Sequence, residues 1–221
     1  DVSEQIALCD RVASEDPAEI RRALGLRPDS TVFTYIGRLV QFKRVDLLIE
    51  AVRQANAGRT RPIEALVVGS GPLEAELRAM AADVPEIHFL GSLPPDERVA
   101  RCLRVSAAVA IAGALGLLIN HAFAHGRAVI TRDNEAHGAE IEYLMHDKNG
   151  LIVPGAIERF AETLARFADD PERQARLSRG ALEAREDFRI ETMVRRFDDA
   201  VCATVARRHE KHRAAAPVAE R

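Results

Sequence analysis

The chain has 221 residues, of which 47% are hydrophobic and 29% charged, a balance typical of a globular protein with a full core. A net charge of −3 gives no global basic field and argues against nucleic acid as the main partner. Three cysteines lie far apart without a CxxC pair, which excludes a disulfide framework and a cysteine zinc site and favours a reducing, cytoplasmic compartment: Cys9, Cys102 and Cys202.

No membrane segment or cleavable leader is predicted. The first residues are polar and lack the apolar core of a signal peptide. The longest uncharged run, residues 106–123, is interrupted by Gly113 and Gly116, so we interpret it as a strand, a turn and a helix.

Residues 1–30 form a predicted lead-in segment of short helical patterns, with a helix beginning at Pro17 and a final turn, GLRPDS. The next stretch, residues 32–36, is rich in β-branched and aromatic side chains and predicts a buried strand. Apolar residues then recur at helical spacing from Val45 to Val52, which indicates a helix packed against the sheet.

Two cations stand between that strand and that helix. Gly37 provides a turn, and Arg38 and Lys43 follow it at the carboxyl end of the strand, where open α/β sheets bind ligands. Guanidinium binds two oxygens at once and ammonium adds a point charge, so the pair suits a diphosphate. Solvated surface charges are the alternative interpretation.

Further strand–turn–helix units predict a doubly wound, Rossmann-like parallel sheet, with strands at residues 63–68, 86–90, 107–111, 128–131 and 151–153. After the first of these, Gly69 and Gly71 allow a ligand to approach the backbone, or simply form a tight structural turn. A dinucleotide fingerprint is incomplete because Glu74 takes the place of its third glycine.

The C-terminal part is predicted to be helical. Residues 157–168 are amphipathic, and residues 190–208 form a long helix with one apolar stripe that we interpret as core. The stripe consists of Met193, Phe197, Val201 and Val205. The tail is predicted to be disordered.

Four motifs occur in order and with fitting spacing: GRLxxxK from Gly37, GxGPL from Gly69, FLG from Phe89 and NGLIVP from Asn149. Together they resemble the C-terminal, donor-binding domain of retaining glycosyltransferases with the GT-B fold. The resemblance implies a donor domain over residues 31–185, a helix at 186–210 that crosses back to an N-terminal acceptor domain, and a tail at 211–221. That acceptor domain is not within this sequence.

The resemblance also implies the site residues. Arg38 and Lys43 would hold the diphosphate of a nucleotide sugar and act in catalysis by stabilising the leaving group. Other donor-binding residues would be Gly37, Gly69, Gly71, Phe89, Leu90, Leu115, Gly116, Leu117, His121 and Glu140.

The E-x7-E motif of the family is absent. Its two positions fall on Gly113 and His121, so neither carboxylate is present, although a neutral His121 can accept a hydrogen bond from a ribose hydroxyl. His121 and His125 have metal-ligand spacing without a third ligand. Asp133 and Glu135 are spaced as D-x-D but are interpreted as loop charges, so we expect no metal and no cofactor.

The sequence thus favours a hexosyltransferase of glycan biosynthesis, using a UDP- or GDP-sugar and a glycan or lipid-linked acceptor. Membrane contact would be peripheral and made through the acceptor half. A non-catalytic nucleotide-sugar-binding module, or a fragment inactive by itself, is the alternative, and a sugar-nucleotide epimerase of the same fold is a more distant one.

Overall fold

The computed structural model describes residues 2–133 and 137–214. Its centre is a six-stranded, all-parallel sheet with the strand order β3-β2-β1-β4-β5-β6. The strands are β1 (Thr31–Ile36), β2 (Ile63–Val68), β3 (Ile87–Gly91), β4 (Ala108–Ile111), β5 (Ala128–Arg132) and β6 (Gly150–Val153). The direction in which strands are added reverses between β1 and β4, which confirms the predicted doubly wound α/β fold.

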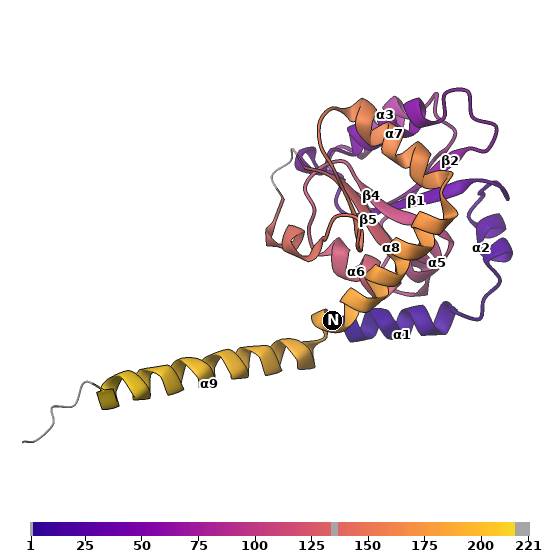
Figure 1. Cartoon of the computed structure of the whole chain (residues 1–221). Coiled ribbons are helices and arrows are strands. Elements are labelled where there is room, and N and C mark those ends of the chain that lie inside the picture. Colours follow the sequence, from indigo (N-terminus) through magenta and orange to yellow (C-terminus); the bar gives the residue numbers. More distant parts are fainter. Residues whose placement is uncertain (1, 134–136, 215–221) are drawn as a thin grey trace, which may run out of the picture.

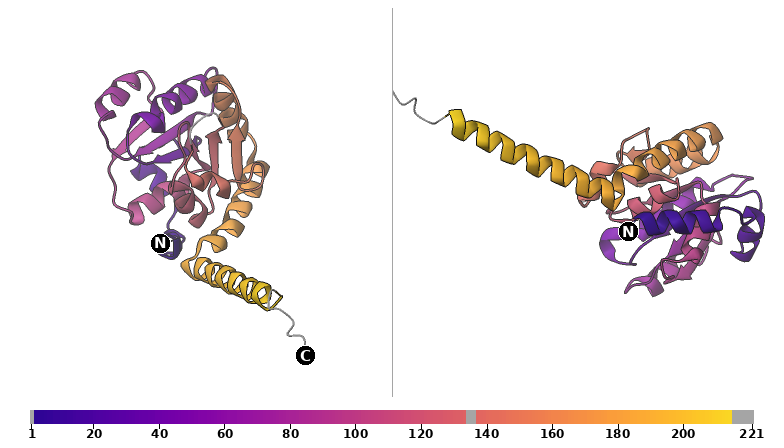
Figure 2. Two further views of the ribbon diagram at one scale, coloured as in Figure 1. Left: turned by 90° about the vertical axis from the view of Figure 1, so that its left-hand side faces the viewer. Right: turned by 90° about the horizontal axis from the view of Figure 1, so that it is seen from below.

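Helices cover both faces of the sheet (Figures 1 and 2). On one face α3 packs against α4 and α7; on the other, α5 and α6 pack against α1, and α2 packs against α5. Helix α8 contacts α6, α7, β5 and β6. The α-helices are α1 (Val2–Val12), α2 (Pro17–Ala23), α3 (Val45–Ala55), α4 (Glu74–Met80), α5 (Glu97–Val105), α6 (Leu118–Ala124), α7 (Ile157–Ala168), α8 (Pro171–Ala184) and α9 (Ile190–Ala214). Short 3₁₀ turns are η1 (Gln41–Lys43), η2 (Ala139–Tyr143) and η3 (Arg185–Phe188).

The two-sided cover explains the apolar strands. All six residues of β2 are buried, as expected of a parallel strand with helices on both faces. Its one acid, Glu64, bonds to the His88 ring at 2.8 Å and to the Arg27 amide at 3.0 Å. Desolvation raises the pKa of Glu64, but these hydrogen bonds outweigh it and the net shift is downward. A buried charge is therefore compatible with this strand.

Helix α7 closes the core on the α3 side. Phe160, Leu164 and Phe167 are at most 1% exposed, which confirms the inward face predicted from their spacing. The Phe167 ring lies 6.1 Å from that of Phe33 on β1. This contact packs α7, in the C-terminal half of the chain, against β1, the strand that precedes the predicted cations.

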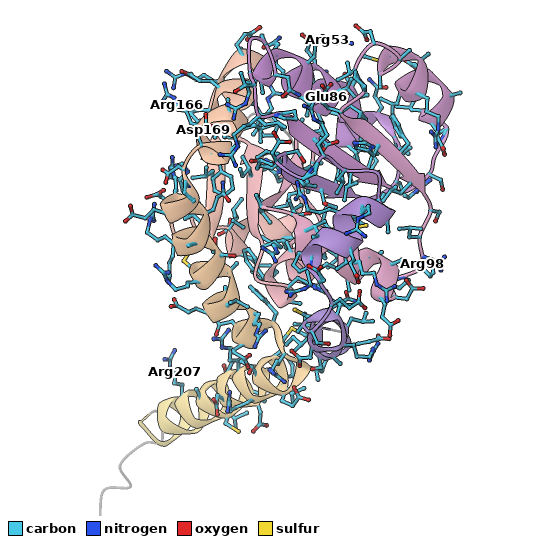
Figure 3. All side chains as sticks on the ribbon, turned by 90° about the vertical axis from the view of Figure 1, so that its right-hand side faces the viewer. Arg53, Glu86, Arg98, Arg166, Asp169 and Arg207 are labelled. Atoms are coloured by element: carbon cyan, nitrogen blue, oxygen red, sulfur yellow. The ribbon has the colours of Figure 1, made fainter. Side chains whose placement is uncertain are left out.

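Helix α9 departs from the sequence-based prediction. Its apolar stripe is exposed rather than buried: Met193 is 56% and Phe197 72% exposed. Figures 1 and 3 show α9 leaving the sheet and its helices, with side chains such as Arg207 standing clear of them. The spacing of apolar residues predicts which face of a helix favours apolar contact. Within the described residues nothing covers that face of α9. The helix continues to Ala214, and residues 215–221 of the predicted tail lie outside the described residues.

The uncharged run at residues 106–123 is divided as predicted, between β4, a loop and α6. Across the described part of the chain, none of the helices is both long and apolar enough to span a membrane.

Candidate functional site

The site lies where the winding of the sheet reverses. From β1 the chain proceeds through α3 to β2, and from β4 it proceeds through α6 to β5, so the two connections diverge. Divergence leaves a crevice at the carboxyl ends of β1 and β4, the position at which doubly wound sheets bind ligands. The loops that follow these strands, residues 37–44 and 112–117, meet at this edge of the sheet.

The two loops are joined by backbone contacts. The amide of Ala114 donates a hydrogen bond to the carbonyl of Phe42 at 2.9 Å. A Cβ on Gly113 would come within 2.5 Å of the Phe42 carbonyl oxygen, so only glycine fits. The space beside Gly113 is therefore filled by the backbone of residues 42–43, and no side chain, acidic or otherwise, is accommodated there.

Lys43 reaches from one loop to the other. Its Nζ donates a hydrogen bond to the Ala114 carbonyl at 2.7 Å and would lie 3.3 Å from a Cβ on Gly116. Desolvation lowers the pKa of this half-buried ammonium, and the Glu140 carboxylate opposes the shift. The structure thus brings together Lys43, Glu140 and the loop around Gly116, all expected at the site. The ammonium is a fixed charge in the crevice.

Arg38 lies on the same loop but is exposed, and in the described part of the chain its side chain makes no hydrogen bond or ion pair. Its carbonyl accepts a hydrogen bond from the Tyr35 hydroxyl at 2.9 Å. Burial raises the pKa of Tyr35, so the hydroxyl stays protonated and donates. This bond holds the turn at Gly37 and leaves the guanidinium available to a ligand.

Gly69 and Gly71 are used by the protein's own backbone. A Cβ on Gly69 would collide with the Gly37 carbonyl, and one on Gly71 would lie 2.8 Å from the Leu39 nitrogen. The Leu39 amide donates to the Ser70 carbonyl at 2.9 Å. Both glycines let the loop after β2 pack against the loop after β1, which favours the structural-turn interpretation of this motif.

Phe89 and Leu90 point to opposite faces of the sheet, as successive strand residues must. The Arg78 guanidinium of α4 lies 4.8 Å from the centre of the Phe89 ring. Leu90 instead lines a cavity of about 210 Å³ with residues of α2 and α5, among them Leu24 and Cys102. The side chains of these two expected donor-binding residues therefore do not face one common pocket.

One histidine of this site was not predicted. The Leu115 amide donates to Nδ1 of His137 at 3.0 Å, and Nε2 of His137 donates to the Arg132 carbonyl at 2.6 Å. Leu115 was expected to offer its amide to a phosphate, but His137 occupies it. Among the described residues, the amides of Gly116 and Leu117 have no hydrogen-bond partner. No sequence signal marks His137, since it lies in a polar loop.

His121 lies away from the lysine. It lines a cavity of about 420 Å³ with Gln5, Leu117, Asn120 and apolar residues of α1, η3 and α9. Desolvation lowers its pKa, and its Nδ1 has no partner in the described structure. Leu117 is the residue that this cavity shares with the loop at residues 112–117.

No metal centre is present among the described residues, where no three His, Cys, Asp or Glu side chains are arranged to hold an ion. His125 is 5% exposed, and desolvation, with smaller contributions from Arg127 and His121, lowers its pKa to about 4. Glu135 of the D-x-D pair lies outside the described residues.

Curated relatives include two transferases. The D-inositol 3-phosphate glycosyltransferase of Kribbella flavida is 28% identical over 190 residues, covering 80% of this chain and 44% of the relative. The GDP-mannose-dependent monoacylated alpha-(1-6)-phosphatidylinositol monomannoside mannosyltransferase of Corynebacterium glutamicum is 31% identical over 172 residues, covering 73% and 44%. The chain thus spans less than half the length of these relatives.

Among solved structures, Anabaena HepE in complex with UDP and glucose superposes with a TM-score of 0.71 at 20% identity, covering 86% of this chain and 53% of HepE. This likeness shows the fold, that of GT-B glycosyltransferase structures. The family model for glycosyl transferases group 1 matches residues 16–184. The chain therefore belongs to the glycosyl transferases group 1 family.

Proposed function

We propose that the crevice between β1 and β4 binds the diphosphate of a UDP- or GDP-sugar, and that the chain is the donor-binding half of a retaining hexosyltransferase. The acceptor would be a glycan or a lipid-linked sugar. The observation that carries the proposal is the Lys43 ammonium, held 2.7 Å from the Ala114 carbonyl, beside two amides that have no partner in the described structure.

The chemistry follows from that geometry. When a sugar leaves its nucleotide, negative charge grows on the diphosphate. A lysine already fixed in the crevice, and an arginine without a side-chain partner among the described residues, stabilise that charge without rearrangement. Arg38 and Lys43 approach from one loop, and the amides of Gly116 and Leu117 from the other.

The relatives support a nucleotide-sugar donor, but they do not share a single nucleotide base. HepE was crystallised with UDP and glucose, whereas the C. glutamicum mannosyltransferase is named for GDP-mannose. Both nucleotides therefore belong in the test.

We assign to Glu140 the role of a missing glutamate of the E-x7-E motif. At Gly113 the backbone of residues 42–43 leaves no room for a side chain, and His121 faces a different cavity. Glu140 is within electrostatic reach of Lys43. We propose that it contacts the donor sugar. A non-catalytic nucleotide-sugar-binding module is the second candidate, favoured by the closed position beside Gly113.

Calorimetry with UDP and GDP tests the site. Lys43→Ala and Arg38→Ala should each weaken binding by roughly 1.5–3 kcal/mol, the range for hydrogen bonds to charged groups. Uridine and guanosine, which lack phosphate, should bind all variants alike. The matched controls are Lys148→Ala and Arg179→Ala, two exposed cations on other surfaces. Unchanged diphosphate affinity in both test variants would contradict the proposal, provided that unfolding curves show them folded.

A further inference from the structure

A second group of cations gathers at the opposite edge of the sheet. Arg21 from α2, Arg104 from α5 and Arg127 before β5 line one cavity of about 280 Å³. The amino ends of β1 and β4 form its floor, at Thr31 and Ala107. Strand β1 is six residues long, so the cavity lies about 17 Å from the crevice of Lys43.

The guanidinium groups are held by carbonyl oxygens rather than by acids. Arg21 Nη2 donates to the Ser30 carbonyl at 2.6 Å and to its hydroxyl at 2.7 Å. Arg127 Nη2 donates to the Arg104 carbonyl at 3.0 Å. The Arg104 group makes only long contacts, 3.4 Å, to the Glu15 carbonyl. The three guanidinium groups are therefore oriented by carbonyl and hydroxyl oxygens, and none of them forms an ion pair among the described residues.

Counter-charges are missing from the cavity. None of the described residues that line it is Asp or Glu. The Glu15 carboxylate accepts hydrogen bonds from Arg101 at 2.7 and 2.8 Å and is also within electrostatic reach of Arg104, but it does not line the cavity. The Nε atoms of Arg21 and Arg127 are buried without a partner among the described residues. Desolvation lowers the pKa of Arg127, and the neighbouring Arg104 adds to the shift, while Cys9 opposes it.

We propose that this cavity, at the amino edge of the sheet, is an oxyanion site that takes a phosphate group, either free or as a small phosphate monoester. A planar guanidinium presents two parallel N–H groups to two phosphate oxygens, and three of them match a doubly charged anion. The site is separate from the crevice of the proposed donor and does not depend on it.

The test uses the full chain carrying Arg38→Ala and Lys43→Ala, so that phosphate binding at the crevice is removed. Inorganic phosphate and glycerol 3-phosphate are titrated separately by calorimetry at constant ionic strength, with chloride as the replaced anion. We expect saturable binding of at least one probe. Binding of phosphate alone identifies a free anion as the ligand, and binding of the ester alone or more tightly identifies an esterified one.

Arg104→Gln is the first variant, since the only hydrogen bonds that it removes among the described residues are the two long ones to the Glu15 carbonyl. It should weaken binding at least about tenfold, the loss expected for one charge-assisted hydrogen bond. Arg127→Gln should do the same, and Arg127→Lys should recover part of the affinity. Arg179→Gln, an exposed arginine outside the cavity, should change nothing.

Unfolding midpoints measured without phosphate separate loss of binding from loss of structure. If Arg127→Gln does not fold, Arg104→Gln and Arg127→Lys decide the question. Absence of saturable binding for both probes, or equal affinity in the parent and in Arg104→Gln, would overturn the proposal.

Discussion

At the scale of single residues, Gly69 allows the loop after β2 to pack against the loop that carries Arg38 and Lys43. Its φ is +141°, and a Cβ there would strike the Gly37 carbonyl. Gly58 also has a positive φ, +74°, but has open space around it. We expect Gly58→Ala to cost about 1 kcal/mol of unfolding free energy, from backbone strain alone. Gly69→Ala should cost on the order of 3 kcal/mol or more, because the loop must also move. Urea unfolding of both variants measures the difference, and equal losses would mean that the two loops separate freely.

His125 gives a second residue-scale prediction, on pH. Burial lowers its pKa from an ordinary 6.5 to about 4 in the folded chain. Between these pH values His125 is protonated in the unfolded chain but neutral in the folded chain. The folded chain therefore has its full stability above pH 6.5 and loses stability as the pH falls toward 4. The loss should reach about 2 kcal/mol at pH 5. His125→Gln, compared with the parent at pH 7 and pH 5, should show a smaller drop. Parallel pH profiles would place the titration elsewhere.

At the scale of elements, α7 and α9 are both amphipathic helices with opposite outcomes. Phe160 on α7 is fully buried, whereas Phe197 on α9 is 72% exposed. Phe160→Ala should therefore cost about 3–5 kcal/mol of unfolding free energy, and Phe197→Ala less than about 0.5. Chemical denaturation at low protein concentration measures both. A comparable loss in Phe197→Ala would show that the stripe on α9 is covered in solution.

For the molecule as a whole, we predict that this 221-residue polypeptide binds UDP or GDP but does not transfer sugar by itself. The crevice is formed within the chain, yet the chain spans only 44% of its first curated relatives. Calorimetry with the nucleotides, beside a transfer assay on the same sample with UDP- and GDP-sugars, tests both halves of the statement. Efficient turnover would show that the polypeptide carries a complete active site.

The sequence by itself determined the sheet and the position of the loop that carries Lys43. The strand predicted at residues 63–68 is β2, because a parallel strand buried on both faces is a nearly continuous apolar run, here interrupted only by Glu64. Lys43 could be placed at the carboxyl edge of the sheet because its position depends on local order alone: strand, glycine turn, cation, helix. Parallel strands place such loops on one edge whatever the details of packing.

Only the tertiary structure decided which backbone and side-chain groups meet. Gly113 and Phe42 are 71 positions apart in the chain, and their contact determines that no side chain fits at position 113. His137, on a distant loop, accepts a hydrogen bond from the Leu115 amide. His121 faces α1, and no sequence motif predicts that α1 packs on α6. The stripe on α9 shows the same limit. Periodicity defines which face of a helix is apolar, but the partner of that face depends on contacts between distant segments, and these arise only when the chain folds.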